Sequence, residues 1–179
     1  ECQTQAPQGI LIVGCGGQQN LQERWVCNVI AQWETRTALN KDDDLTGFYT
    51  RIEGSSLSKI IRKCRSTGSL LPVQKLLMAG PQSTHNVNDC SRLVVITHFD
   101  RISKNESDQF LASQCIDFLL ENFSLLVVTL QSHPATLNLH PTLASRLCAG
   151  FLLPVPTNTP YAQETHSNSS TSKMESLVK

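Results

Sequence analysis

The feature that most constrains the fold of this chain is an apolar run that ends in a cluster of glycines. Residues Ile10–Val13 are four consecutive aliphatics, and Gly14, Gly16 and Gly17 follow at once. Beyond the glycines, apolar residues recur at helical spacing over residues 21–33. A strand, a tight turn and a helix in this order predict the first unit of an α/β fold.

Alternation of strand and helix patterns continues along the chain. The aliphatic segments 93–96 and 125–129 predict strands that are buried on both faces, as in a parallel sheet. Because parallel strands need right-handed crossovers, the sequence predicts an α/β, three-layer fold with a mostly parallel sheet and helices on both faces. Shorter strands are predicted over 46–52 and 151–155, and further helices over 55–65, 73–79, 107–123 and 141–148.

Two details of these helices are predicted from side-chain chemistry. Ser55 or Ser56 is expected to cap the helix over 55–65, because a serine hydroxyl accepts a hydrogen bond from a free helical N–H group. The helix over 107–123 is expected to bury one apolar face. The residues of that face are Phe110, Leu111, Ile116, Leu119 and Leu120.

Composition limits the organisation and the partners. We expect a flexible lead-in over 1–8, one domain over 9–155 and a polar, disordered tail over 156–179, which is too poor in apolar residues to fold by itself. Fifteen basic and fifteen acidic residues cancel, so no overall field recruits nucleic acid or an anionic membrane. Seven scattered cysteines predict reduced, buried thiols of a cytoplasmic protein.

The glycine turn has the layout of a phosphate-binding loop, in which Gly and four further residues precede Gly-Lys-Ser/Thr. Here Asn20 stands in the lysine position and Leu21 in that of the hydroxyl that holds Mg²⁺. Weak binding of ATP or ADP would then depend on backbone N–H groups at the start of the helix. The residues of this vestigial nucleotide site are Gly14, Gly16, Gly17, Gln18 and Asn20.

Residues 125–155 carry the most specific family pattern. A strand ends in Thr129, the polar Gln131 follows, and a Pro-x-x-Leu turn spans Pro134–Leu137. A short helix then ends in Ser-Arg-Leu at 145–147, and Gly150 opens the next strand. This arrangement resembles the AAA+ ATPase domain of the bacterial chromosomal replication initiator, the DnaA family.

The resemblance implies a role for several positions. Gln131 occupies the sensor position, and Arg146 that of an arginine finger, which reaches the nucleotide of a neighbouring subunit. In the alternative interpretation Arg146 is a surface residue at a helix C-terminus. The family's Walker B strand ends in two carboxylates, whose positions here hold Thr97 and His98. Either His98 or Asp100 substitutes as a ligand, or His98 is a hydrogen-bonded strand-end residue with no metal, which the poor affinity of imidazole for Mg²⁺ favours.

The function implied by the resemblance is that of a degenerate initiator-like domain. We expect a protein associated with DNA replication initiation or its regulation, which acts through protein contacts with little or no ATP hydrolysis. Its expected partner is a replication initiator or another AAA+ subunit, with DNA reached only indirectly and no membrane. We expect neither the family's helical lid nor its DNA-binding domain in the residues after 156.

Two other interpretations stay open. The chain is alternatively a small nucleotide-dependent hydrolase or transferase with a non-standard loop, although Gln19 stands where a dinucleotide-binding loop needs glycine. The basic segment at 59–65 is either a solvated helix face or a patch for a phosphate backbone. His133 and His140 precede prolines and are expected in loops, because no third ligand at zinc spacing accompanies them. No metal site is predicted.

Overall fold

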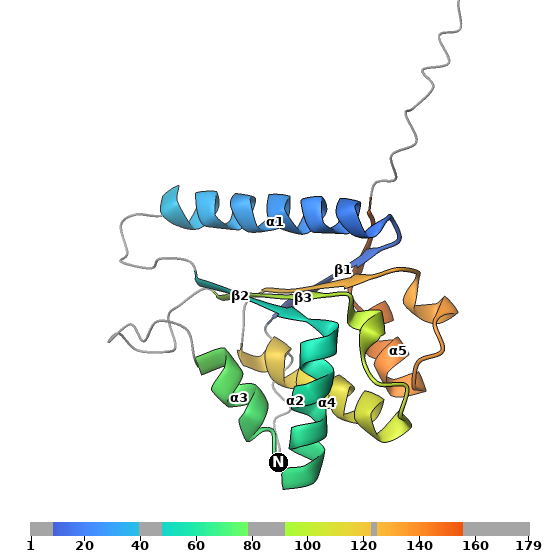
Figure 1. The fold of residues 1–179 in the computed structure, drawn as a ribbon. Helices are drawn as coiled ribbons and strands as arrows, with labels where there is room; N and C mark the ends of the chain where they lie inside the picture. The colour runs from blue at the N-terminus through green and yellow to red at the C-terminus, as the bar shows by residue number, and fades with distance from the viewer. Residues whose placement is uncertain (1–8, 40–47, 79–91, 123–124, 156–179) are drawn as a thin grey trace, which may run out of the picture.

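The computed structural model describes residues 9–39, 48–78, 92–122 and 125–155, and in these ranges a five-stranded sheet forms the centre (Figure 1). All strand pairs are parallel, and the strand order is β2-β3-β4-β1-β5. The predicted parallel sheet is therefore confirmed. The strands are β1 (Ile10–Cys15), β2 (Phe48–Glu53), β3 (Arg92–Thr97), β4 (Leu125–Leu130) and β5 (Phe151–Pro154).

Helices cover both faces of the sheet, as predicted. Helix α1 (Gln19–Leu39) lies alone on one face, and the other four α-helices of the described ranges lie on the opposite face (Figure 1). These are α2 (Gly54–Thr67), α3 (Leu71–Met78), α4 (Glu106–Asn122) and α5 (Pro141–Cys148), together with the 3₁₀ turns η1 (Phe99–Arg101) and η2 (Pro134–Thr136). No helix in the described ranges is both long enough and apolar enough to cross a membrane.

The two central strands are buried on both sides. In β3 the side chains of Leu93 and Val95 pack with Val127 of β4 beneath α1. Val94 and Ile96 point to the other face and join the larger core under α2, α4 and α5. All of these residues are fully buried, which explains why the two runs lack the polar alternation of a one-sided sheet.

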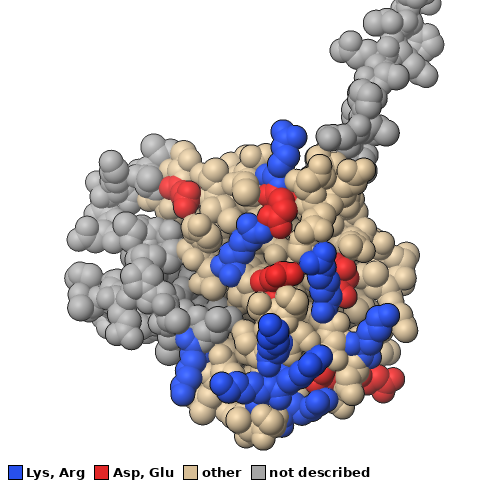
Figure 2. Space-filling model, viewed as in Figure 1, with Lys and Arg blue, Asp and Glu red and all other residues tan. Residues whose placement is uncertain are grey.

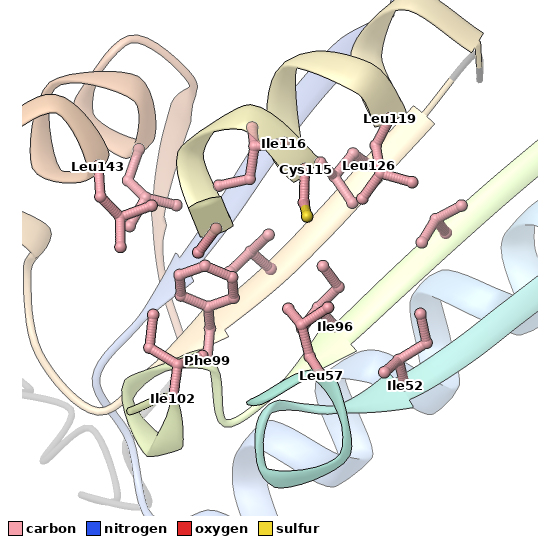
Figure 3. Packing of buried hydrophobic residues seen from close by; sticks show 14 of the residues in the cluster. Ile52, Leu57, Ile96, Phe99, Ile102, Cys115, Ile116, Leu119, Leu126 and Leu143 are labelled. Atoms are coloured by element: carbon pink, nitrogen blue, oxygen red, sulfur yellow. The ribbon is translucent and has the colours of Figure 1, made fainter. Parts of the chain in front are cut away.

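The larger core extends to the segment that follows the carboxyl end of β3. Figure 3 shows Phe99 of η1 between Leu143 of α5, Ile102 and the helix α4 that carries Ile116. The Phe99 ring is completely buried, so the turn that follows β3 is held by apolar packing. The carboxyl end of β3 is thus held directly by packing against the core.

Two predictions about the helix ends are wrong. Glu53 is the N-cap of α2, so Ser55 and Ser56 lie inside the helix rather than before it. Helix α1 continues to Leu39, beyond the predicted end at 33. Residues 34–36 of α1 are polar and exposed, so they have no apolar periodicity that could reveal the extension; Thr37 bonds back to the Trp33 carbonyl group.

Two predictions about burial are also corrected. Phe110, in the first turns of α4, is 44% exposed, and its ring packs edge-on against that of His140. Among the cysteines that the structure describes, all five are free thiols, but only Cys64 and Cys115 are buried. Burial raises the pKa of the Cys115 thiol to about 12, which makes it unreactive at neutral pH.

We expect Gly54→Ala to destabilise the fold by about 1–3 kcal/mol, the usual cost of overpacking. A Cβ atom on Gly54 would overlap the backbone carbonyl oxygen of His98, which cannot move without shifting η1. Urea denaturation measures the change. Ser56→Ala, in the same turn but exposed, is the control and should stay within about 0.5 kcal/mol of the wild type. Equal stability of the two variants would contradict the close approach of α2 to the end of β3.

Candidate functional site

The turn between β1 and α1 consists of three residues, and two of them are glycines that the backbone requires. Gly16 and Gly17 have φ angles of 82° and 77°, in the left-handed region that favours glycine. Gly14, by contrast, lies inside β1, so its predicted role in the turn is wrong. It is instead a site of close packing: a Cβ atom there would lie 2.8 Å from Cζ3 of Trp25.

A buried glutamine fixes this turn to the neighbouring strand. Nε2 of Gln22 donates to the carbonyl oxygens of Gly16 and Leu130, both at 2.9 Å. The Gly16 N–H group also donates to the Leu130 carbonyl oxygen, at 3.0 Å. Strands β1 and β4 are neighbours whose following helices leave on opposite faces, which is where ligands bind in open α/β sheets. At this point the amide of Gln22 bridges the turn after β1 and the end of β4.

The predicted nucleotide-binding residues form the outer part of the turn. Gln18 and Asn20 are exposed, and Asn20 lies in the first turn of α1, whose N–H groups have no partners within the helix. Leu21, in the position where a phosphate-binding loop has a hydroxyl, is only 8% exposed and points into the protein. The side chain at that position is therefore packed as part of the core.

An open hollow of about 480 Å³ lies beside the turn, at the carboxyl ends of β2 and β3. This size is within the range of small-molecule sites. The sequence predicted two of its lining residues, Thr97 and His98, as the Walker B positions. The others were missed; the full lining is Gln19, Glu23, Arg51, Glu53, Thr97 and His98.

The charged groups around the hollow pair with one another. Glu23 of α1 forms an ion pair with Arg51 of β2. On η1, the Arg101 guanidinium lies 3.1 Å from the Glu53 carboxylate and 3.3 Å from Oε1 of Gln19. Each carboxylate that lines the hollow thus has an arginine partner from another element.

His98 has an unusual backbone and a buried ring. It is the only non-glycine residue in the described ranges with a positive φ (φ 51°, ψ 50°). Its backbone N–H group donates to Oγ1 of Thr129 at 2.9 Å. His98 is therefore hydrogen-bonded at the strand end through its backbone. The ring is 4% exposed, and within the described residues neither nitrogen has a hydrogen-bond partner; Nε2 lies 3.4 Å from Oε1 of Glu23.

Solved structures with the same arrangement of strands and helices include two of replication initiators. One, described as a DNA replication initiation factor, has 12% sequence identity and a TM-score of 0.53, and the match covers 84% of this chain and 40% of that one. The other, domain III of the Thermotoga maritima replication initiation protein DnaA, has 15% identity and a TM-score of 0.50, over 84% and 55% of the two chains. Neither a family model nor a curated protein sequence matches significantly.

The chain has the same P-loop-type α/β fold as these two structures. The fold predicted from the phosphate-binding-loop layout and residues 125–155 is therefore confirmed. At these identities the likeness concerns the fold alone, and the chain spans about half or less of the two structures that it matches.

Within this fold, the predicted sensor residue Gln131 lies just after β4, next to η1. Its backbone N–H group donates to Oδ1 of Asp100 at 3.3 Å, while its side chain is exposed. Asp100 is not among the residues that line the hollow. The structure thus joins these two residues to each other and leaves both outside the hollow.

Arg146, in the predicted arginine-finger position, is half exposed on α5. Its Nε atom lies 2.9 Å from Oδ1 of Asp117 on α4. An exposed pair of this kind contributes about 1 kcal/mol at most, so a stronger partner could displace Asp117. Arg146 does not line the hollow.

The two histidines that precede prolines are helix caps. Nδ1 of His133 accepts from the N–H group of Ala135 at the start of η2, and Nδ1 of His140 accepts from that of Thr142 at the start of α5. Their side chains therefore have structural roles. No cluster of potential metal ligands occurs among the residues that the structure describes.

The predicted basic segment lies on the outer side of α2. In Figure 2 the Lys and Arg side chains gather over the lower part of the molecule, where Figure 1 places this helix. One of them, Arg65, lies 3.0 Å from the buried Asp108 carboxylate of α4, so it stabilises helix packing. The exposed basic residues of α2 are Lys59, Arg62, Lys63 and Arg65.

We expect Gln22→Met to destabilise the fold by about 1–3 kcal/mol, because it removes the two hydrogen bonds that the Gln22 amide donates to the Gly16 and Leu130 carbonyl groups while the side-chain volume hardly changes. Gln18→Met, in the same turn but exposed, is the matched control and should have little effect. Urea denaturation followed by circular dichroism measures both. Loss of stability in the Gln18 variant alone would contradict the proposed anchoring of the turn.

Proposed function

We propose that this chain is a DnaA-like AAA+ domain that takes part in DNA replication initiation or its regulation through protein contacts, with little or no ATP hydrolysis. Its fold is that of replication initiators. The observation that carries the second part of the proposal is the composition of the hollow: its carboxylates are already paired with arginines, and no lysine lines it among the described residues.

The chemistry of phosphoryl transfer explains why this composition disfavours hydrolysis. A P-loop ATPase needs a lysine on the transferred phosphate, a hydroxyl and a carboxylate on Mg²⁺, and a polar group that orients water. The corresponding positions hold Asn20, Leu21, Thr97 and His98, and Leu21 is packed into the core. Backbone N–H groups at the start of α1 are then the remaining source of affinity for a phosphate, which supports weak nucleotide binding at most.

Protein contact is supported by the position of Arg146. An arginine that is half exposed and only weakly held by Asp117 can exchange that carboxylate for an acidic group of a partner or for the phosphates of a nucleotide that the partner binds. We propose a replication initiator or another AAA+ subunit as this partner, with DNA reached through it. The exposed basic side chains of α2 offer a second, weaker route to nucleic acid.

We expect calorimetry to detect no Mg²⁺-dependent binding of ATP or ADP at micromolar affinity, since the lysine and the metal ligands of the loop are missing. An active DnaA AAA+ domain titrated under the same conditions is the positive control. Micromolar binding that requires Mg²⁺, or ATP turnover above that of heat-inactivated protein, would contradict the proposal and favour a nucleotide-dependent enzyme.

We further expect this chain to bind the DnaA-type initiator of its own organism, measured by biolayer interferometry with and without ATP. Arg146→Ala should weaken this binding about tenfold or more, because a hydrogen-bonded contact to a charged group contributes about 1.5–3 kcal/mol. Arg24→Ala, which removes an exposed arginine of α1, is the control. Absence of binding in every nucleotide state, or equal weakening by both variants, would refute the proposed contact.

A further inference from the structure

Three elements that are far apart in the sequence meet at the hollow through one residue, Glu23. One carboxylate oxygen of Glu23 pairs with Arg51 of β2, and the other lies 3.4 Å from Nε2 of His98, which follows β3. The Glu23 and Arg51 side chains are 35% and 37% exposed, so water screens their attraction only in part. Glu23 therefore links the first turns of α1 to the ends of two strands at once.

A second set of contacts crosses the same hollow. Arg101 of η1 reaches Glu53 at the end of β2 and Gln19 at the start of α1. Glu53 is also the N-cap of α2, where a negative charge is favourable because the N-terminus of a helix is its positive end. Together the two sets connect α1, β2, β3 and η1 around the hollow.

The position of His98 shows that this arrangement is tightly determined. A left-handed backbone costs a non-glycine residue free energy and persists only where the surroundings impose it. Here the surroundings are Gly54, which packs against the His98 carbonyl oxygen, and Thr129, which accepts from its N–H group. The result is a buried imidazole in the wall of the hollow, directly beside Glu23.

We propose that these six residues (Gln19, Glu23, Arg51, Glu53, His98 and Arg101), the edge network, are an internal substitute for a bound ligand. In a ligand-dependent site, opposite charges that meet across the gap come from the bound molecule and its metal ion. In this chain they are supplied by side chains, which join the start of α1 to β2, β3 and η1. The residues at the carboxyl ends of β2 and β3 then keep one arrangement, and ligand binding does not switch it.

This inference deepens the proposed function, because it makes the partner-binding state of the chain independent of nucleotide. It does not depend on the identity of the partner. The edge network predicts a local effect: weakening it should loosen α1 and the strand ends around the hollow, and leave the distant α4 unchanged. Native-state hydrogen exchange separates such local opening from global unfolding.

The test compares Glu23→Gln with Glu34→Gln by hydrogen exchange and mass spectrometry. Glutamine keeps the size of Glu23 but removes its charge, and Glu34 is an exposed residue of α1 without an ion pair in the described ranges. Exchange in peptides that cover 16–23, 48–54 and 97–101 should rise about two- to fivefold in Glu23→Gln, as the loss of a partly exposed ion pair allows. Peptides of α4 should not change, and Glu34→Gln should match the wild type.

A double variant shows whether the contacts act together. If Glu23 and Arg51 belong to one network, Glu23→Gln/Arg51→Gln should exchange no faster than the more affected single variant. Additive effects of the two substitutions would overturn the proposal. So would an identical response to Glu23→Gln and Glu34→Gln, or an increase spread equally over all peptides.

Adding Mg²⁺ and ATP to the wild type separates this inference from the proposed function. We expect no Mg²⁺-dependent protection of residues 16–23 by nucleotide at micromolar concentrations. Protection would overturn the proposed absence of an ATP-dependent state, and also the role of the edge network as a substitute for a ligand. If initiator binding fails while Glu23→Gln loosens the hollow selectively, the partner is wrong and the edge network stands.

Discussion

The structure depends on the burial of β3 and β4 between two layers of helices. Their side chains are sealed from water on both faces, with α1 on one side and the larger core on the other. Removal of such aliphatic surface from water is the dominant favourable contribution to folding. Because Thr97, His98 and Thr129 lie at the ends of these strands, the positions of the polar groups at the carboxyl edge are set by the apolar sheet beneath them.

Much of this fold could be predicted because its signals are local. The strands at 93–96 and 125–129 and the helix at 141–148 were predicted to within two residues, since aliphatic runs and Pro-initiated helices leave clear patterns. The predictions failed where tertiary packing decides. Ser55 and Ser56 look like caps, yet the contact between Gly54 and His98 starts α2 earlier.

The candidate site was predictable only in part. The loop follows from spacing along the chain, and the Thr97 and His98 positions follow from the family resemblance, whereas Glu23, Arg51, Glu53 and Arg101 were missed. These four residues lie on three elements, α1, β2 and η1, and carry no motif, so only the fold brings them together. Charge pairs between distant segments are visible in a structure and not in a single sequence.

The contact between Trp25 and Gly14 makes tryptophan fluorescence a reporter of the turn. An indole ring that rests on the backbone just before the loop senses changes in polarity and packing there, and the second tryptophan, Trp33, lies about two turns further along the same helix. The tryptophan fluorescence of the chain therefore originates entirely from α1. Any molecule that docks at the start of this helix, or any movement of the helix relative to β1, would be recorded by emission from the unlabelled protein.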